Sequence, residues 1–170
     1  PILPLFADFE LEVKFYRTQT STRETLVAQY SGEGRVNLEV TAANALRLFV
    51  GSGSGNIDLS GGSIAVGVNT VKVKRFGVSP NNYAFQLFLN GTQVAASATS
   101  DSISLSNINT RLGDLNGVAG RNFRGAIMSV NVAFNDVSCD FTTGGQHGAS
   151  SFVTSTGQTV TINKTGLDPS

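Results

Sequence analysis

The chain has 170 residues, of which 40% are hydrophobic and 14% charged, and its 12 basic residues balance 12 acidic residues to a formal charge of zero. This balance argues against a nucleic-acid-binding protein, which normally carries a basic stripe or patch. A single cysteine, Cys139, excludes a disulfide framework within the chain, and the absence of any apolar run of about 18 residues argues against membrane insertion.

The clearest predicted strand runs from Asp8 to Phe15, where polar and apolar residues alternate strictly. A period of two residues indicates a strand with one face in the core and the other in water. The buried face is predicted to hold Phe9, Leu11, Val13 and Phe15. The carboxylates of Asp8, Glu10 and Glu12 then share the wet face, with successive ones about 6.5–7 Å apart.

Further strands follow in the first half of the chain, separated by loops rich in Gly, Ser, Thr and Asn. Alternating apolar residues predict them at Leu26–Tyr30, Val36–Val40, Leu46–Val50, Ile57–Leu59 and Val71–Phe76. The last of these contains the largest basic cluster of the chain, Lys72, Lys74 and Arg75. We expect this cluster to be a solvated strand face rather than a site for a polyanion.

The second half of the chain contains a strong hairpin signal, Asn90-Gly91, between the predicted strands Tyr83–Leu89 and Thr92–Val94. Both turn residues of such a hairpin need a positive φ, which Asn and Gly tolerate best. Strands are also predicted to begin at Ile103, to run over Met128–Phe134 and Val137–Phe141, and to recur between Ser151 and Lys164.

These patterns predict an all-β protein, because about eleven to thirteen short strands occur without any amphipathic helix. The alternating faces and regular turns indicate an antiparallel two-sheet sandwich or jelly roll. No repeat of fixed period points to a propeller or a β-helix. We expect one domain over residues 8–170, preceded by an N-terminal segment of residues 1–7.

Two stretches resemble laminin G-like domains of the concanavalin A-like class. The first is VNTVKVKR at residues 68–75, followed by FQLFLNGTQVA at residues 85–95. The second is Leu112-Gly113-Asp114, followed by FRGAIMSVNV at residues 123–132, which is similar to the family signature (I/L)G…F-x-G-x-I-x-x-V. The resemblance implies a concanavalin A-like jelly roll, and it places Gly125 where two backbone segments approach closely.

The same resemblance implies one Ca²⁺ at the rim of the sandwich, held by oxygen ligands from loops. Asp114 and Asn116 lie together in a suitable loop, and Asp58 is a candidate third ligand from a distant loop. The alternative role for such loop residues is to form Asx turns, which are more common than metal sites. Ca²⁺ is therefore the one candidate cofactor of this chain.

The low charge and the abundance of Ser, Thr, Asn and Gly are similar to the C-terminal receptor-binding domains of bacteriophage tail fibres and tailspikes. This second resemblance implies a homotrimer on the virion surface, outside the cell, that binds a bacterial surface polysaccharide. Residues 1–7 would then either pack between subunits or cover one end of the sandwich.

Candidate sugar-binding residues lie in the loop after Leu112 and on one predicted strand. The loop combines Asp114, Asn116, Arg121 and Asn122 with small residues, a mixture suited to recognising hydroxyl groups, and Tyr83 is a candidate for stacking on a sugar ring. An ordinary polar loop is the alternative interpretation. The single His147 has no second histidine or adjacent carboxylate with which to form a triad or a zinc site.

The strongest enzymatic candidate is the triplet Asp8, Glu10 and Glu12, because some glycoside hydrolases of this fold use an acidic triplet on one strand. The order of the residues differs from that motif, and the chain has no Trp on which a sugar could stack. We therefore expect a non-catalytic carbohydrate-binding adhesion module. A structural or assembly domain of the same fold and a polysaccharide-degrading enzyme remain the alternatives.

Overall fold

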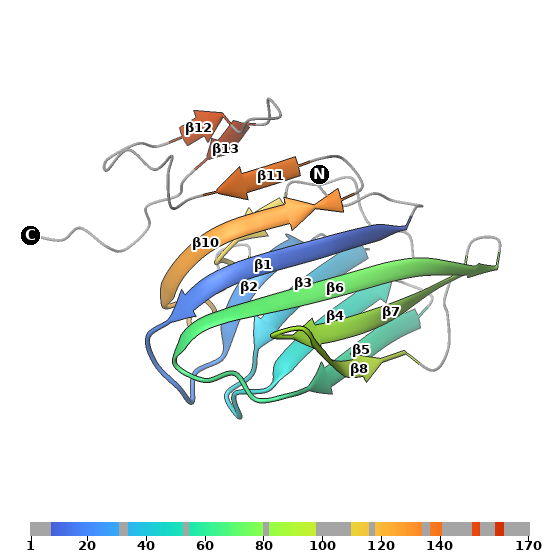
Figure 1. Ribbon diagram of the computed structural model, residues 1–170, viewed down its shortest axis with the longest axis horizontal. Coiled ribbons are helices and arrows are strands. Elements are labelled where there is room, and N and C mark those ends of the chain that lie inside the picture. Colours follow the sequence, from blue (N-terminus) through green and yellow to red (C-terminus); the bar gives the residue numbers. More distant parts are fainter. Residues whose placement is uncertain are drawn as a thin grey trace, which may run out of the picture.

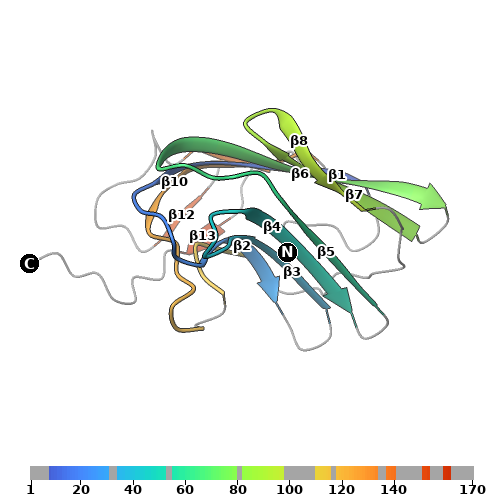
Figure 2. The ribbon, with the colours of Figure 1, turned by 90° about the horizontal axis from the view of Figure 1, so that it is seen from below.

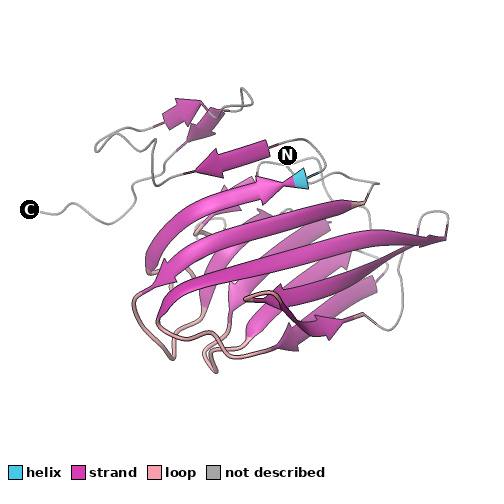
Figure 3. Cartoon of the chain, in the orientation of Figure 1, coloured by secondary structure: helices cyan, strands magenta, loops and turns pink. Residues whose placement is uncertain are grey.

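The computed structural model describes residues 8–30, 34–52, 55–79, 82–97, 110–115, 118–133, 137–140, 151–153 and 159–161. These residues form thirteen strands and no α-helix, as the sequence predicts (Figure 1), and the short helical piece coloured after β10 in Figure 3 is 3₁₀ in form. The strands are β1 Phe9–Arg17, β2 Glu24–Tyr30, β3 Gly34–Val40, β4 Leu46–Ser52, β5 Gly55–Gly61, β6 Gly67–Ser79, β7 Asn82–Leu89, β8 Thr92–Ala96, β9 Thr110–Leu112, β10 Gly125–Val132, β11 Val137–Asp140, β12 Ser151–Val153 and β13 Thr159–Thr161. The described part of the chain contains no helix with the length and apolar character needed to cross a lipid bilayer.

The strands form two large sheets that lie face to face as two layers (Figure 2). One sheet has six strands in the order β11-β10-β1-β6-β7-β8, and the other has five in the order β5-β4-β3-β2-β9. Neighbouring strands in both sheets run antiparallel. Strands β12 and β13 pair with each other in a separate small sheet. The predicted two-sheet sandwich of jelly-roll type is confirmed.

The hydrophobic core lies between the inner faces of the two large sheets. Strand β1 supplies Phe9, Leu11, Val13 and Phe15, none of which is more than 4% exposed. Strands β3 and β4 supply the facing residues, among them Leu38 and Leu48, which are fully buried. Burying a side chain of this size stabilises the fold by about 1.5–3 kcal/mol, so the alternation seen in the sequence places each sheet's apolar face inward.

The basic cluster on β6 divides between the two faces of its sheet. Lys72 and Lys74 lie on the outer face, where they form ion pairs with Glu10 and Glu12 of β1. Arg75 is only 2% exposed, and its guanidinium lies 3.7 Å from the centre of the Tyr83 ring. Burial lowers the pKa of Arg75 to about 10. The expectation of one solvated face is therefore wrong for Arg75, because an odd separation along a strand reverses the direction of the side chain.

A second arginine, Arg17, is fully buried at the opposite end of β1. Its Nε donates to Glu24 over 2.9 Å, and its Nη1 donates to Asn44 Oδ1 and to the carbonyl of Ile64. Buried charges are tolerated in this way only when they are paired and hydrogen-bonded. The pair of Arg17 and Glu24 thus joins β1 to the start of β2 across the end of the sandwich.

Two local predictions about backbone geometry are confirmed. Asn90 and Gly91 both have positive φ, 49° and 82°, as expected for a tight hairpin between β7 and β8. Gly125 begins β10 opposite Arg17, and a Cβ atom added there would collide with the carbonyl oxygen of Tyr16. Three predicted features, namely residues 1–7, the strand beginning at Ile103 and the loop holding His147, lie outside the described residues.

Gly125→Ala is expected to lower the free energy of unfolding by about 1–3 kcal/mol, because the added methyl group forces β1 and β10 apart. Gly77→Ala is the matched control: Gly77 also lies in a strand, and the nearest atom to its added Cβ would be Asp8 Oδ1 at 3.6 Å. Urea unfolding measures both variants. Equal midpoints for the two variants would contradict the close approach at Gly125.

Candidate functional site on the outer face of the five-stranded sheet

The outer face of the five-stranded sheet carries an unusual set of polar residues. Because Val36, Leu38 and Val40 of β3 enter the core, the intervening Asn37 and Glu39 project from the opposite face. The strand register places Glu39 between Thr25 of β2 and Arg47 of β4. Residues from three strands therefore meet around one carboxylate.

The side chain of Glu39 is completely buried although it lies on the outer face of its sheet. Three arginines surround it: Nη2 of Arg23 lies 2.6 Å from Oε1, Nη1 of Arg47 2.9 Å from Oε1, and Nη1 of Arg121 3.0 Å from Oε2. Nδ2 of Asn37 also donates to Oε2 over 2.8 Å. Burial by itself raises the pKa of Glu39, but the hydrogen bonds from Arg23 and Arg47 outweigh it and hold the pKa below 4.5. Glu39 is thus a carboxylate at neutral pH.

Arg121 reaches Glu39 from the loop of residues 118–124, which is fastened to the sheet by its backbone. The carbonyl of Arg121 accepts from the amide of Thr25 over 2.8 Å, and the amide of Phe123 donates to the carbonyl of Gly113. The next amide, that of Arg124, donates to Oε1 of the buried Glu24. These bonds hold the loop against β2 and fix the position from which Arg121 extends.

Arg47 connects this carboxylate to the far edge of the sheet. Its Nε and Nη2 donate to the two carboxylate oxygens of Asp58 on β5, over 2.8 and 2.6 Å. The guanidinium carbon of Arg47 lies 5.5 Å from the centre of the Phe49 ring, on the same strand. Phe49 is half-buried, and a Cβ at Gly51 would lie only 2.9 Å from its ring. The glycine leaves room for the ring beside the charged pair.

Two covered oxygen atoms on this face have no hydrogen-bond partner among the described residues, Oδ1 of Asn37 and Oγ1 of Thr25. The amide of Asn37 cannot be turned around, because its nitrogen must donate to the carboxylate of Glu39. Its oxygen is therefore a true acceptor. A buried acceptor without a donor costs about 1–3 kcal/mol, so these two atoms lower the stability of the face and are covered from any ligand that lies on it.

The structure brings some of the predicted site residues together and separates others. Arg121 contacts Glu39, and the exposed Asn122 follows it in the same loop. Asp114 accepts from Arg111 of β9 over 3.0 Å, at the edge of this sheet. Tyr83 lies elsewhere, on β7, where its ring contacts Arg75. Asn116 lies outside the described residues.

Several residues of this face were missed in the sequence, namely Arg23, Asn37, Glu39, Arg47 and Phe49. The alternation of β3 and β4 does predict that Asn37, Glu39, Arg47 and Phe49 point outward. Nothing in the sequence, however, indicates that Glu39 is buried on that face or that Arg121, 82 residues away, contacts it.

The strand order separates two of the predicted calcium ligands. Asp58 lies on β5 and Asp114 directly follows β9, and these strands are the opposite edges of the sheet. Four strand spacings amount to roughly 19 Å, which is too far for one ion. Each carboxylate also pairs with an arginine, Arg47 or Arg111. The described residues contain no group of three His, Cys, Asp or Glu side chains suited to a metal ion.

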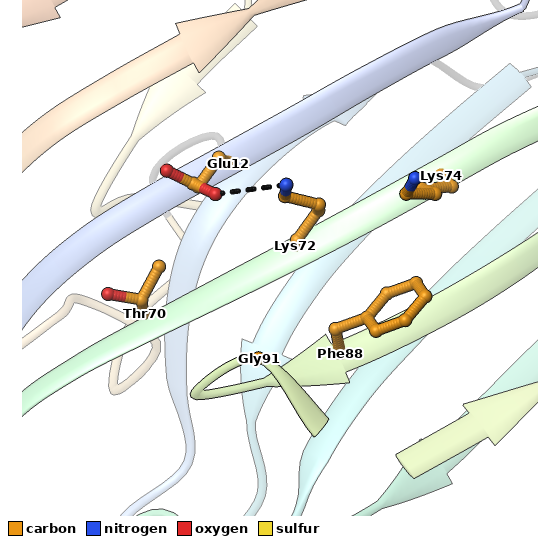
Figure 4. A pocket seen from close by; sticks show the side chains of 6 residues that line it. All are labelled: Glu12, Thr70, Lys72, Lys74, Phe88 and Gly91. Carbon is orange, nitrogen blue, oxygen red and sulfur yellow. Dashed lines mark ion pairs between the residues drawn. The ribbon is translucent and has the colours of Figure 1, made fainter. Parts of the chain in front are cut away.

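The outer face of the six-stranded sheet has a different character (Figure 4). A shallow hollow of about 240 Å³ lies there between Glu12, Thr70, Lys72, Lys74, Phe88 and Gly91. Its ion pairs are solvated, with side chains 33–41% exposed, and such pairs contribute little to stability.

The acidic triplet lies on this same face, as predicted. Glu10 and Glu12 pair with the two lysines, and Asp8 accepts from the amide of Gly77 over 2.7 Å. The bond from Lys74, which lies 2.6 Å away, is the main cause of a lowered pKa for Glu10. A general acid for glycoside cleavage needs a raised pKa instead.

No protein-family model matches the sequence, and no curated protein matches it either. Among solved structures, the chain is similar to the CBM40 module of the Ruminococcus gnavus IT-sialidase bound to α2,6-sialyllactose, with a TM-score of 0.58 and 19% identity over 74% of this chain and 76% of that one. Domains LG4-5 of the mouse laminin α1 chain give a TM-score of 0.59 and 16% identity over 82% of this chain and 37% of that one.

The enzymatically active domain of tailspike protein 2 from bacteriophage CBA120 gives a TM-score of 0.50 and 14% identity over 74% of this chain and 22% of that one. At these identities the similarity establishes the fold alone. That fold is the laminin G-like, concanavalin A-like sandwich, in agreement with the resemblance seen in the sequence.

Glu39→Gln is expected to lower the free energy of unfolding by about 2–3 kcal/mol, because it leaves three guanidinium groups without their shared anion. The loss stays below that of a fully buried pair, since the arginine side chains are 24–36% exposed. Glu12→Gln, which removes a solvated carboxylate from the other sheet, is the control, with an expected loss of about 0–1 kcal/mol.

The stability that Glu39 contributes is expected to decrease at acidic pH. A carboxyl group whose pKa is lower in the folded state than 4.5 stabilises the protein above pH 4.5, and this contribution disappears as the pH falls through the folded-state pKa. The stability difference between wild type and Glu39→Gln should therefore shrink as the pH falls below 4.5. Urea unfolding across acidic pH measures it, and a constant difference would contradict the assignment.

Proposed function

We propose that this domain is a non-catalytic carbohydrate-binding module, with its ligand on the outer face of the five-stranded sheet. The observation that carries the proposal is the half-buried ring of Phe49 beside the locked pair of Arg47 and Asp58. Sugar-binding sites combine an apolar ring, which covers the C–H face of a sugar, with charged groups that bond its hydroxyls. On this face Phe49 supplies the ring, and Arg47 on the same strand and Asp58 on the neighbouring strand supply the charged groups.

The rigidity of these groups favours binding. Arg47 is held by Glu39 and Asp58 together, and Arg121 is held by Glu39 and by the backbone bonds of its loop. Side chains that are already fixed lose little conformational entropy when a ligand binds.

The similar structures support the same function, because one of them is a carbohydrate-binding module with sialyllactose bound. We further propose that the domain is carried on a viral tail fibre as a homotrimer at the virion surface, where it attaches to a polysaccharide of the host cell. The low charge of the sequence and the similarity to a bacteriophage tailspike support this setting.

A panel of bacterial surface polysaccharides and oligosaccharides tests the proposal. The wild-type domain is expected to bind at least one glycan saturably, and Phe49→Ala is expected to weaken that binding about tenfold or more, as the loss of a central aromatic contact does. Calorimetric titration gives the two affinities.

Phe88→Ala is the matched control, because Phe88 is also a half-buried aromatic with a cation beside it, Lys74 at 5.9 Å, on the outer face of the other sheet. We expect its affinity to equal that of wild type. Absence of binding across the panel would favour a structural or assembly domain, and a loss in Phe88→Ala alone would move the site to the hollow of Figure 4.

A further inference from the structure

The centre of the candidate site carries an excess of positive charge. Three guanidinium groups, those of Arg23, Arg47 and Arg121, meet there, whereas two carboxylates among the described residues, Glu39 and Asp58, pair with them. Asp58 is bonded through both oxygens to Arg47 alone. Arg23 and Arg121 therefore share the charge of Glu39 with a third cation, and neither is fully neutralised.

The two under-neutralised arginines also retain unused donors. Arg47 employs all three of its nitrogens, two toward Asp58 and one toward Glu39. Arg121 donates only through Nη1, and Arg23 only through Nε and Nη2, so Nε and Nη2 of Arg121 and Nη1 of Arg23 have no partner among the described residues. With side chains 24% and 36% exposed, both groups remain accessible to a ligand.

From this arrangement we infer that the bound glycan carries a carboxylate, which the free N–H groups of Arg121 and Arg23 receive. The inference rests on the proposed carbohydrate-binding function and names the chemical class of its ligand. Glu39 acts as the positioning residue, because its two oxygens hold both guanidinium groups at one place on the sheet.

The physical reason for a carboxylate is the charge balance after binding. A ligand that covers this face removes water from the arginines, and a neutral sugar would leave the excess charge without a partner. A carboxylate supplies the missing negative charge and accepts two parallel N–H bonds from one guanidinium, which are about twice as strong as bonds between neutral groups. The pKa of Glu39, lowered by Arg23 and Arg47 against the effect of burial, keeps that residue ionised, so it continues to hold the arginines.

The test compares each acidic sugar with its own methyl ester, which keeps the shape and removes the charge. The probes are sialyllactose and oligogalacturonate, both as free acids and as methyl esters, together with lactose and sulfated lactose, titrated calorimetrically into the whole chain. At least one acid should bind about tenfold or more tightly than its ester, and Arg121→Gln should reduce this ratio of affinities to about one.

Arg124→Gln is the matched control, since Arg124 is exposed in the same loop and only its backbone has a role in holding that loop. It should keep the preference for the acid. Arg23→Gln provides a second test should Arg121→Gln fail to fold, which urea unfolding reveals. Loss of the preference in Arg124→Gln, or its persistence in both other variants, would overturn the assignment of Arg121 and Arg23.

The remaining outcomes separate this inference from the proposed function. If acids and esters bind equally and Phe49→Ala loses this binding, the inference of a carboxylate on the ligand is wrong, but the proposed carbohydrate-binding function stands. Binding of sulfated lactose in preference to every carboxylated sugar would overturn the carboxylate as well. No binding of any sugar on the wider panel would overturn both.

Discussion

Strand β3 imposes the constraint on which the rest of the site depends. Val36, Leu38 and Val40 must face the core to bury their apolar surface, and the two-residue period then forces Glu39 onto the outer face in the middle of the sheet. A buried carboxylate is costly unless positive groups and hydrogen-bond donors surround it. The chain supplies them from three separate segments, through Arg23, Arg47 and Arg121. Core packing and the chemistry of the outer face are therefore two consequences of one alternation.

A chain of buried polar contacts links the end of the sandwich to this site. Arg17 fixes Glu24, and the other carboxylate oxygen of Glu24 accepts from the amide of Arg124. That amide belongs to the loop that carries Arg121, whose carbonyl is in turn bonded to the amide of Thr25. Networks of this kind are rigid when all members are satisfied, because each bond orients the next. These bonds hold the loop against the strands beside it.

The two outer faces use similar residues with different results. Glu10, Glu12, Lys72 and Lys74 alternate across β1 and β6 as solvated ion pairs, which water screens and which keep the surface polar. On the five-stranded sheet Glu39 is buried, three arginines meet two carboxylates among the residues that the structure describes, and an aromatic ring lies beside them. Burial and imbalance, rather than the presence of charge, make this second face suited to a ligand.

The sequence alone determined the strand faces, one hairpin and one close backbone approach. It gave the faces of β1 through its strict alternation, the hairpin at Asn90 and Gly91 through their tolerance of positive φ, and the close approach at Gly125 through its family signature. The strand faces and the hairpin are local, so period and turn chemistry suffice to predict them. The close approach at Gly125 follows from the family resemblance instead, and the resemblance together with the local patterns predicted the sandwich.

Only the tertiary structure decided which distant residues meet. In the folded chain Arg121 contacts Glu39, which lies 82 residues away in the sequence. Asp58 and Asp114 lie at opposite edges of one sheet, and Tyr83 packs against Arg75. Sheet order and cross-strand register follow from how two apolar faces pack together. This packing involves the whole chain at once, so it cannot be predicted from the residue pattern of any short segment.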